Sequence, residues 1–368
     1  MLTYTLIILF AFTMSAICGF IMIPQIISFC KKKNLYDAPD ARKIHKSAVP
    51  RLGGVSFMPS MLIATIVALL VWVSTCKYNK ICVSPWCIFF GIGITIIYIT
   101  GVIDDIFGVR ARVKLLMQIV VASLLPMSYL YINNLYGFLG IYEIPPLVGT
   151  ILTIGVLVFI MNAINLIDGI DGLSASLTLI ALGGLFYIFH REQIWVYCIL
   201  IAGLMGVLIP FLYHNIWGKE EKNQKIFMGD SGSLTLGYIL GVLMIKFCMY
   251  NPHVMPYQKG ATLLSVTLLL VPTFDVFRVI IVRLINHKPI FTADKNHIHH
   301  KLMRTGLTQH QTLISVILLS VLFIIINLTL FNELVVTWII AIDILIYIAF
   351  QYSLDVIIKR KNLQPFVQ

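Results

Sequence analysis

The sequence predicts an all-α integral membrane protein with about eleven transmembrane helices. Of its 368 residues, 59% are apolar and only 12% are charged, and the mean hydropathy is +0.92. Apolar runs of about 20 residues, the length that spans a bilayer as a helix, recur from one end of the chain to the other. This composition excludes a water-soluble globular protein and also a disordered chain.

The distribution of basic residues predicts the orientation of these helices. Most of the 27 Lys and Arg residues lie in alternate connections and in the C-terminal tail. The positive-inside rule places these segments in the cytoplasm, so we expect the N-terminus outside and the C-terminus cytoplasmic. The predicted spans lie roughly at residues 3–29, 53–74, 85–103, 113–132, 146–165, 173–189, 194–213, 233–250, 261–282, 312–331 and 334–357.

The seven cysteines contain no CxxC pair. We expect most of them to act as small apolar residues in or near the spans. Cys76 and Cys82, which share one predicted external loop, are the pair placed to form a disulfide.

Ionisable residues concentrate in the connections that we assign to the cytoplasm. Such groups are costly at membrane depth and usually functional, so the polar work of this protein is expected at the cytoplasmic face. The chain is interpreted as a single membrane domain over residues 1–368. Its active-site loops are predicted near residues 31–52, 104–112, 166–172, 214–232 and 283–311.

Two adjacent acids, Asp104 and Asp105, end the third predicted span. Neighbouring carboxylates repel each other and call for a cation, a basic partner or a shared proton. The alternative is an ordinary helix terminus in which Asp105 caps the next span.

A polar stripe ends the fifth predicted span, where Asn162, Asn165, Asp168 and Asp171 recur every three residues. On a helix these side chains drift by roughly 60° per step. The two Asp-Gly steps should unwind the chain and free backbone groups for a ligand, which membranes tolerate beside a water-filled cavity. The alternative is a plain Asp-Gly turn.

Asp230 precedes the small residues Ser231, Gly232 and Ser233, which can open a helix. That helix start suits an oxyanion or a metal ligand near a phosphate, although a simple Asp N-cap is the alternative. Together with the polar stripe, Asp230 predicts a divalent-cation site. Oxygen ligands of this kind select Mg²⁺ or Mn²⁺ over zinc.

Three histidines, His297, His299 and His300, lie among Lys and Arg residues in the last long connection. They indicate a clamp for a phosphate. A zinc cluster is the alternative, but zinc sites usually contain Cys or differently spaced His, and the chain has no HExxH motif.

A second cationic segment precedes Gly53 and Gly54 and includes Lys46. It is expected to contact the same anion. The alternative is a basic anchor for anionic lipid, which accounts better for the three lysines at positions 31–33.

Taken together, these segments resemble the polyprenyl-phosphate N-acetylhexosamine-1-phosphate transferase family. The matching motifs, in family order, are DAPDARKIHKSAVPRLGG (37–54), GVIDDIFG (101–108), NAINLIDGIDGL (162–173), MGDSGS (228–233), PTFD (272–275) and HIHH (297–300). The last motif is similar to that of the undecaprenyl-phosphate GlcNAc-1-phosphate transferase branch, and it disfavours the muramoyl-pentapeptide branch, which has an all-His run.

The resemblance implies a Mg²⁺-dependent enzyme of the bacterial inner membrane, with Mn²⁺ also suitable. It would transfer GlcNAc-1-phosphate from UDP-GlcNAc to undecaprenyl phosphate at the cytoplasmic face, releasing UMP. This would be the first lipid-linked step of a cell-surface polysaccharide such as lipopolysaccharide O-antigen. No nucleic-acid partner is expected, and a homodimer is left open.

The resemblance also implies roles for individual residues. Asp230 and Asn165 would contact the metal ion. The implied catalytic residues are Asp104, Asp105, Asp230 and His299, of which Asp104 would accept or orient the proton of the attacking phosphate. The implied substrate-binding residues are Lys46, Asn162, Asn165, Asp168, Asp171, His297 and His300.

Two alternatives to this function remain. The same chemistry could use another UDP-sugar, carrying FucNAc, GalNAc, bacillosamine or MurNAc-pentapeptide, and a covalent aspartyl intermediate could replace direct displacement. A secondary transporter would also carry polar residues in its spans. It would place them near the midplane, whereas here they gather at one side.

Overall fold

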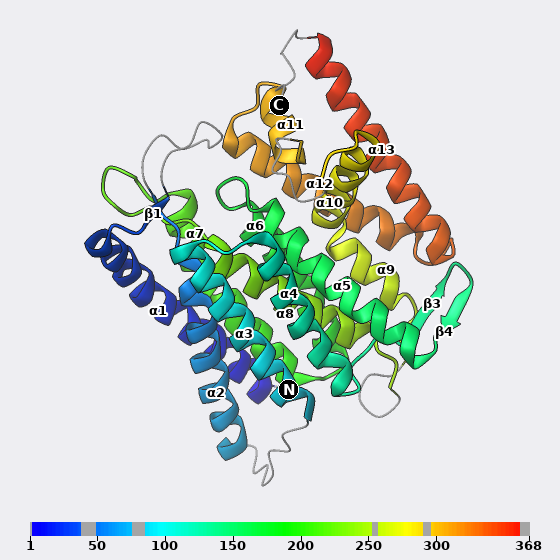
Figure 1. Ribbon diagram of the computed structural model, residues 1–368. Coiled ribbons are helices and arrows are strands. Elements are labelled where there is room, and N and C mark those ends of the chain that lie inside the picture. The colour runs from blue at the N-terminus through cyan, green and yellow to red at the C-terminus, as the bar shows by residue number, and fades with distance from the viewer. Residues whose placement is uncertain (1, 38–48, 76–84, 252–256, 290–295, 361–368) are drawn as a thin grey trace. The chain divides into compact units, whose positions relative to one another are not determined.

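A computed structural model describes residues 2–37, 49–75, 85–251, 257–289 and 296–360 (Figure 1). The all-α class is confirmed, apart from two short antiparallel strand pairs. By length and composition, nine helices in the described part of the chain can cross a membrane. The chain divides into two compact units, residues 1–130 with 178–243 and residues 131–177 with 244–368.

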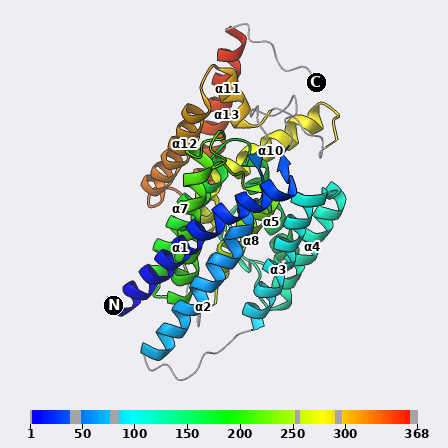
Figure 2. The same ribbon diagram turned by 90° about the vertical axis from the view of Figure 1, so that its left-hand side faces the viewer.

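The first unit is a helical bundle in which α1, α2 and α7 pack on one another (Figures 1 and 2). Packing between α3 and α4 brings the end of one helix near the start of the next. Its elements are α1 (Leu2–Lys33), β1 (Tyr36–Asp37), β2 (Val49–Pro50), the 3-10 turn η1 (Gly53–Ser56), α2 (Phe57–Thr75), α3 (Pro85–Phe107), α4 (Ala111–Met127), most of α6 (Leu173–Arg191), α7 (Trp195–Ile216) and most of α8 (Gly229–Cys248).

The second unit packs α5 against α10 and gathers α9, α11, α12 and α13 around them. Strands β3 and β4 form an antiparallel hairpin in this unit. The other strand pair, β1 with β2, belongs to the first unit and pairs Tyr36 with Pro50. The elements of the second unit are β3 (Asn134–Phe138), β4 (Ile141–Glu143), α5 (Pro146–Ile167), the first turn of α6, the end of α8, α9 (Ala261–Leu268), α10 (Leu270–Ile285), α11 (Ile298–Arg304), α12 (Gln309–Leu330) and α13 (Val336–Arg360).

One predicted span is not a single helix. Residues 261–282 were expected to be continuous, but the structure breaks them at Leu269, between α9 and α10. Pro272 explains the break because it has no N–H to donate to the carbonyl of Leu268 four residues earlier. The proline is instead accommodated in the first turn of α10, where a helix needs no such donor.

The fourth predicted span corresponds to α4, which has 17 residues. A helix of that length is roughly 26 Å long, near the lower limit for crossing the hydrocarbon core. The count of eleven spans and the orientation of the termini therefore stay predictions. Cys76 and Cys82, the only pair that the sequence places where a disulfide could form, lie outside the described residues.

Candidate functional site

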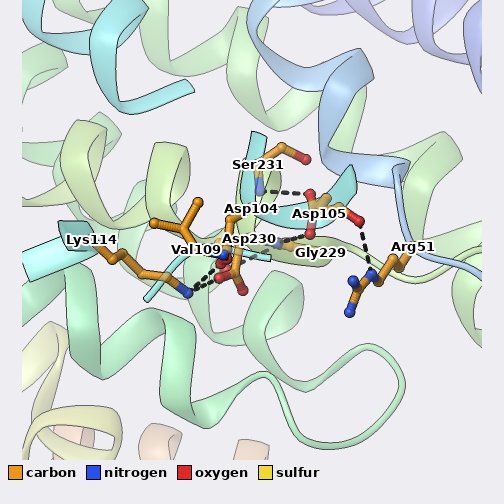
Figure 3. A network of polar contacts seen from close by, with 9 residues as sticks. Arg51, Asp104, Asp105, Val109, Lys114, Gly229, Asp230 and Ser231 are labelled. Carbon is orange, nitrogen blue, oxygen red and sulfur yellow. Dashed lines mark hydrogen bonds and ion pairs between the residues drawn. The ribbon is translucent and has the colours of Figure 1, made fainter. Parts of the chain in front are cut away.

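The first unit contains a polar cluster at the end of α3 (Figure 3). Asp104 and Asp105 lie in the last turn of α3, Lys114 in the first turn of α4 and Asp230 in the first turn of α8. The predicted loops near 104–112 and 214–232 therefore meet here.

Lys114 links two carboxylates in this cluster. Its Nζ donates to Oδ2 of Asp230 and forms an ion pair with Oδ2 of Asp104. Oδ1 of Asp104 accepts from the backbone N–H of Val109 at 2.5 Å. The side chains of Asp104 and Asp230 keep 11% and 25% of their exposure, so a ligand can reach both acids.

Asp105 has a different role from its neighbour. Its carboxylate accepts from the backbone N–H groups of Asp230 at 2.8 Å and Ser231 at 2.9 Å. It therefore caps the start of α8, not the start of α4 as the alternative interpretation of the sequence had it. The residue before α4, Arg110, makes no side-chain cap. A capping carboxylate also complements the positive end of the helix dipole.

Close backbone contacts fix the position of this helix start. A Cβ on Gly101 of α3 would lie 2.5 Å from Cα of Ser231. Gly229 has a φ of +72°, and a Cβ there would overlap the backbone oxygen of Arg51. Arg51 Nε in turn donates to the backbone oxygen of Asp105 at 3.1 Å. Part of the first predicted loop thus joins the cluster.

The donor chemistry of this cluster fits a hard divalent cation. Asp104 and Asp230 direct carboxylate oxygens toward one positive group, the ammonium of Lys114. Within the described residues, no three His, Cys, Asp or Glu side chains are grouped so that they could hold a metal by themselves. An ion here would need substrate oxygens and water as further ligands, which is usual for Mg²⁺.

A second cluster, in the second unit, surrounds the buried acid Asp275 of α10. Its Oδ2 is 2.8 Å from His297 Nδ1, and its Oδ1 accepts from Arg278 Nη2 at 3.0 Å. Oδ1 also accepts from the backbone N–H of Ile298 at 3.0 Å and from the Tyr347 hydroxyl at 3.3 Å. The carboxylate therefore joins α10, α11 and α13.

The three predicted histidines lie together in this cluster. The rings of His297 and His299 are stacked with centroids 5.9 Å apart, and His300 lies 4.2 Å from His299. His299 is 1% exposed, and its Nδ1 has no hydrogen-bond partner among the described residues. Burial lowers the pKa of His299 well below its usual range, and the neighbouring histidines add to this effect.

The loop after α5 meets the same histidines. Helix α5 ends at Ile167 and α6 begins at Leu173, and Gly172 between them has a φ of +75°. The predicted unwinding at the two Asp-Gly steps is confirmed. A Cβ on Gly169 would overlap the ring of His299. The polar stripe and the HIHH motif, predicted to serve one site, are therefore in contact.

The remaining predicted residues have the following positions. Asp171 is buried, whereas Asn162, Asn165, Asp168 and His300 are partly exposed. Asn162 Nδ2 donates to the backbone oxygen of Val158. Asp230 belongs to the first unit and Asn165 to the second, so their shared metal site stays a prediction. Lys46 lies outside the described residues.

An apolar cavity of about 720 Å³ also lies in the second unit. Apolar side chains of α5 and α10, among them Phe159 and Phe277, line its walls. Arg278, Lys301 and Asp355 also line the cavity, and Lys301 Nζ pairs with Asp355 at 2.7 Å. The mainly apolar lining can therefore take an apolar chain.

Three residues of these clusters were not predicted as site residues. Lys114 resembles any basic residue at the cytoplasmic end of a span. Asp275 and Arg278 lie in a predicted span, and Asp275 belongs to the PTFD motif without an assigned role. The signal for this pair was present, because an acid and a base one helical turn apart are rare in an apolar helix.

These clusters and helices define a polytopic membrane protein with one acidic and one histidine-rich site. Residues 87–248 match a family model described as Glycosyl transferase family 4. The chain is 31% identical over 337 residues to a probable undecaprenyl-phosphate N-acetylglucosaminyl 1-phosphate transferase of Bacillus subtilis (strain 168), covering 86% of this chain and 83% of the relative.

Two further relatives have similar names. A decaprenyl-phosphate N-acetylglucosaminephosphotransferase of Mycobacterium leprae is 30% identical, over 73% of this chain and 70% of the relative. An undecaprenyl-phosphate alpha-N-acetylglucosaminyl 1-phosphate transferase of Escherichia coli (strain K12) is 25% identical, over 79% of this chain and 75% of the relative. The chain belongs to glycosyl transferase family 4, which confirms the resemblance found in its motifs.

Proposed function

We propose that this protein transfers GlcNAc-1-phosphate from UDP-GlcNAc to undecaprenyl phosphate in the bacterial inner membrane. The products are undecaprenyl-diphospho-GlcNAc and UMP. The observation that carries the proposal is the pair of carboxylates, Asp104 and Asp230, directed at one cation beside a helix start. The names of the three relatives support the same donor sugar and a polyprenyl phosphate acceptor.

The chemistry brings two anions together. A phosphate oxygen of the lipid attacks the β-phosphorus of UDP-GlcNAc, a new P–O bond forms, and the bond from that phosphorus to the bridging oxygen breaks. The leaving group is UMP. Positive charge on the diphosphate and in-line positioning are what lower the barrier of such a transfer.

The first cluster suits the acceptor phosphate and a divalent ion. Mg²⁺ bound there would neutralise charge on the diphosphate, and Asp230 and Asp104 would hold it. Lys114 contributes a fixed positive charge next to both acids. Asp104, with one oxygen held by Val109 N–H, is oriented to accept or position the proton of the attacking phosphate. Asp105 keeps the start of α8 in place.

The second cluster suits the anionic donor. His297, His299 and His300 offer ring nitrogens, and Arg278 adds a permanent positive charge. Asp168 and Asp171, in the loop that touches His299 through Gly169, supply carboxylates able to accept from the uracil N–H.

The apolar cavity suits the prenyl chain of the acceptor. Burial of its methylene groups contributes favourable free energy at about 0.8 kcal/mol for each CH₂ removed from water, although much of that gain is already realised in the bilayer. The cavity therefore serves mainly to orient the prenyl chain of the lipid.

The test is to incubate the purified protein with undecaprenyl phosphate, Mg²⁺ and one of several UDP-sugars. Mass spectrometry should find the lipid diphosphate sugar, and UMP should appear in equal amount, with UDP-GlcNAc as the preferred donor. Preference for another UDP-sugar would correct the donor. No lipid product with any donor would refute the proposal.

Two variants sharpen this test. Asp230→Asn should remain folded in the membrane yet lose UMP release by roughly 10²- to 10³-fold, because a charged group at the reacting phosphates is removed. Glu192→Gln is the matched control, since Glu192 pairs with Arg191 in an exposed site outside both clusters. Turnover like that of the unmodified protein in Asp230→Asn would remove Asp230 from the mechanism.

A further inference from the structure

We infer that Asp275 is a positioning residue that sets the proton position and the orientation of His297, and thereby the binding of the UDP-sugar. This inference rests on the proposed function, which assigns the histidines to the donor. Neither the polar stripe nor the acidic pair of the first unit includes Asp275.

The hydrogen bonds of Asp275 specify the imidazole. A carboxylate only accepts, so the 2.8 Å contact requires that Nδ1 of His297 carries the hydrogen. The other ring nitrogen, Nε2, is then the atom left for a ligand. The same carboxylate accepts from the N–H of Ile298, the first residue of α11. It therefore also fixes the start of the helix that carries His299 and His300.

The position of Asp275 is itself fixed from three directions. Arg278 comes from the same helix, His297 from the connection before α11 and Tyr347 from α13. The acid is 0% exposed. A buried carboxylate with this many donors is held in one rotamer. Because Asp275 cannot rotate, it can hold the ring of His297 in one orientation.

Asp343 provides an internal comparison. It is also 0% exposed, lies in the same unit and accepts from Asn327 Nδ2 at 2.8 Å. Within the described part of the chain it makes no hydrogen bond to a histidine. Its partner Asn327 of α12 also donates to Thr267 of α9, so this acid serves the packing of α9, α12 and α13. The variant Asp343→Asn therefore measures the effect of removing a buried acid from the helix packing without touching the histidine cluster.

The experiment compares Asp275→Asn, Asp275→Glu and the control Asp343→Asn in the full-length protein. Steady-state kinetics are measured separately for UDP-GlcNAc and undecaprenyl phosphate, together with the melting temperature. Asp275→Asn should raise KM for UDP-GlcNAc on the order of 10- to 100-fold, the size of effect seen when a metal-binding histidine loses its outer partner. KM for undecaprenyl phosphate should stay within about 2-fold. Asp275→Glu, which retains the acceptor, should recover part of the loss.

A purely structural role predicts a different pattern. Fewer active molecules lower kcat and leave both KM values unchanged, which is the result expected for Asp343→Asn. The same pattern in Asp275→Asn would overturn the inference. If that variant does not fold, His297→Gln carries the test, because it removes the ring that Asp275 positions. It should raise KM for UDP-GlcNAc and leave KM for undecaprenyl phosphate unchanged, and an unchanged KM for UDP-GlcNAc would overturn the inference.

A double-mutant cycle provides an independent check. In a His297→Gln background, Asp275→Asn should change KM for UDP-GlcNAc by less than about 2-fold, because residues that act through one another are not additive. Full additivity would contradict the inference. Failure of the unmodified protein to turn over UDP-GlcNAc would instead refute the proposed function, so the two failures are distinguishable.

Discussion

The two clusters use a buried aspartate in the same way and differ in what surrounds it. Asp105 and Asp275 each accept from the backbone N–H of a helix start that is distant in sequence. Both oxygens of Asp105 accept from backbone N–H groups. Asp275 instead divides its oxygens among a backbone N–H, an arginine, a tyrosine and a histidine.

The difference in charge is as informative as the difference in partners. In the first cluster, the carboxylates of Asp104 and Asp230 converge on the ammonium of Lys114, an arrangement suited to a cation. In the second cluster, Arg278 and His297 contact the buried acid Asp275, and His299 and His300 lie beside His297. This surplus of basic side chains suits an anion. The proposed Mg²⁺-dependent transfer between two phosphates would use both kinds of site.

The largest expected effect comes from removing the cation of the acidic cluster. Lys114→Gln should lower kcat/KM by roughly 10²- to 10³-fold, because a fixed positive charge beside the reacting phosphates is lost. It also leaves Asp104 and Asp230 facing each other without a cation. We therefore expect Mg²⁺ to raise the melting temperature of the variant more than that of the unmodified protein.

The comparison for this variant is Lys114→Arg, which keeps the charge. If Mg²⁺ stabilises Lys114→Gln and the unmodified protein equally, the acidic cluster does not bind the ion, and the contrast between the two clusters loses its basis.

A smaller effect is expected from crowding the histidine cluster. Gly169→Ala places a methyl group on the ring of His299, so the ring or the loop must shift. A misplacement of about 1 Å in a site costs on the order of 100-fold in rate. The loss in kcat/KM should therefore lie between about 10- and 100-fold, measured by UMP release.

Gly155→Ala is the matched control. Gly155 lies in the same helix-and-loop segment, and a Cβ there meets nothing within 4 Å. It should leave the kinetics unchanged and, as a helix-interior replacement, stabilise by up to about 1 kcal/mol. Equal losses in both variants would show that the contact between Gly169 and His299 has no role in turnover.

The smallest effect concerns pH. Burial keeps the pKa of His299 below its ordinary value of 6.5, so below that pH the unfolded chain binds a proton that the folded protein resists. Stability contributed by neutral His299 is present above about pH 6.5 and is lost as the pH falls toward the folded-state pKa. The contribution changes by at most about 1.4 kcal/mol per pH unit.

Thermal unfolding of the unmodified protein and of His299→Gln between pH 7.5 and 5 checks this expectation. The melting temperature of the unmodified protein should fall more steeply below about pH 6.5, because glutamine does not titrate. Parallel curves would mean that His299 binds its proton equally well in both states, and that burial does not hold its ring neutral.

The acidic residues of the site could be found in the sequence because acids that end apolar runs are conspicuous. Asp104 and Asp105 were chosen on that basis, and Asp230 was chosen because it precedes small residues that can open a helix. The structure brings all three together. The histidines were found by their density, and their contact with the Asp-Gly loop was predicted in outline. Lys114 and Asp275 could not be assigned, because each has an ordinary sequence context and acquires its role from distant partners.

The sequence by itself determined the membrane class, most helix positions, the inventory of charged groups and the family. These follow from hydropathy and local composition, which act over about 20 residues. Only the tertiary structure decided that Asp105 caps a helix 125 residues away and that Tyr347 reaches Asp275 across 72 residues. Hydrogen bonds between buried groups depend on which helices pack together, and no local pattern encodes that choice.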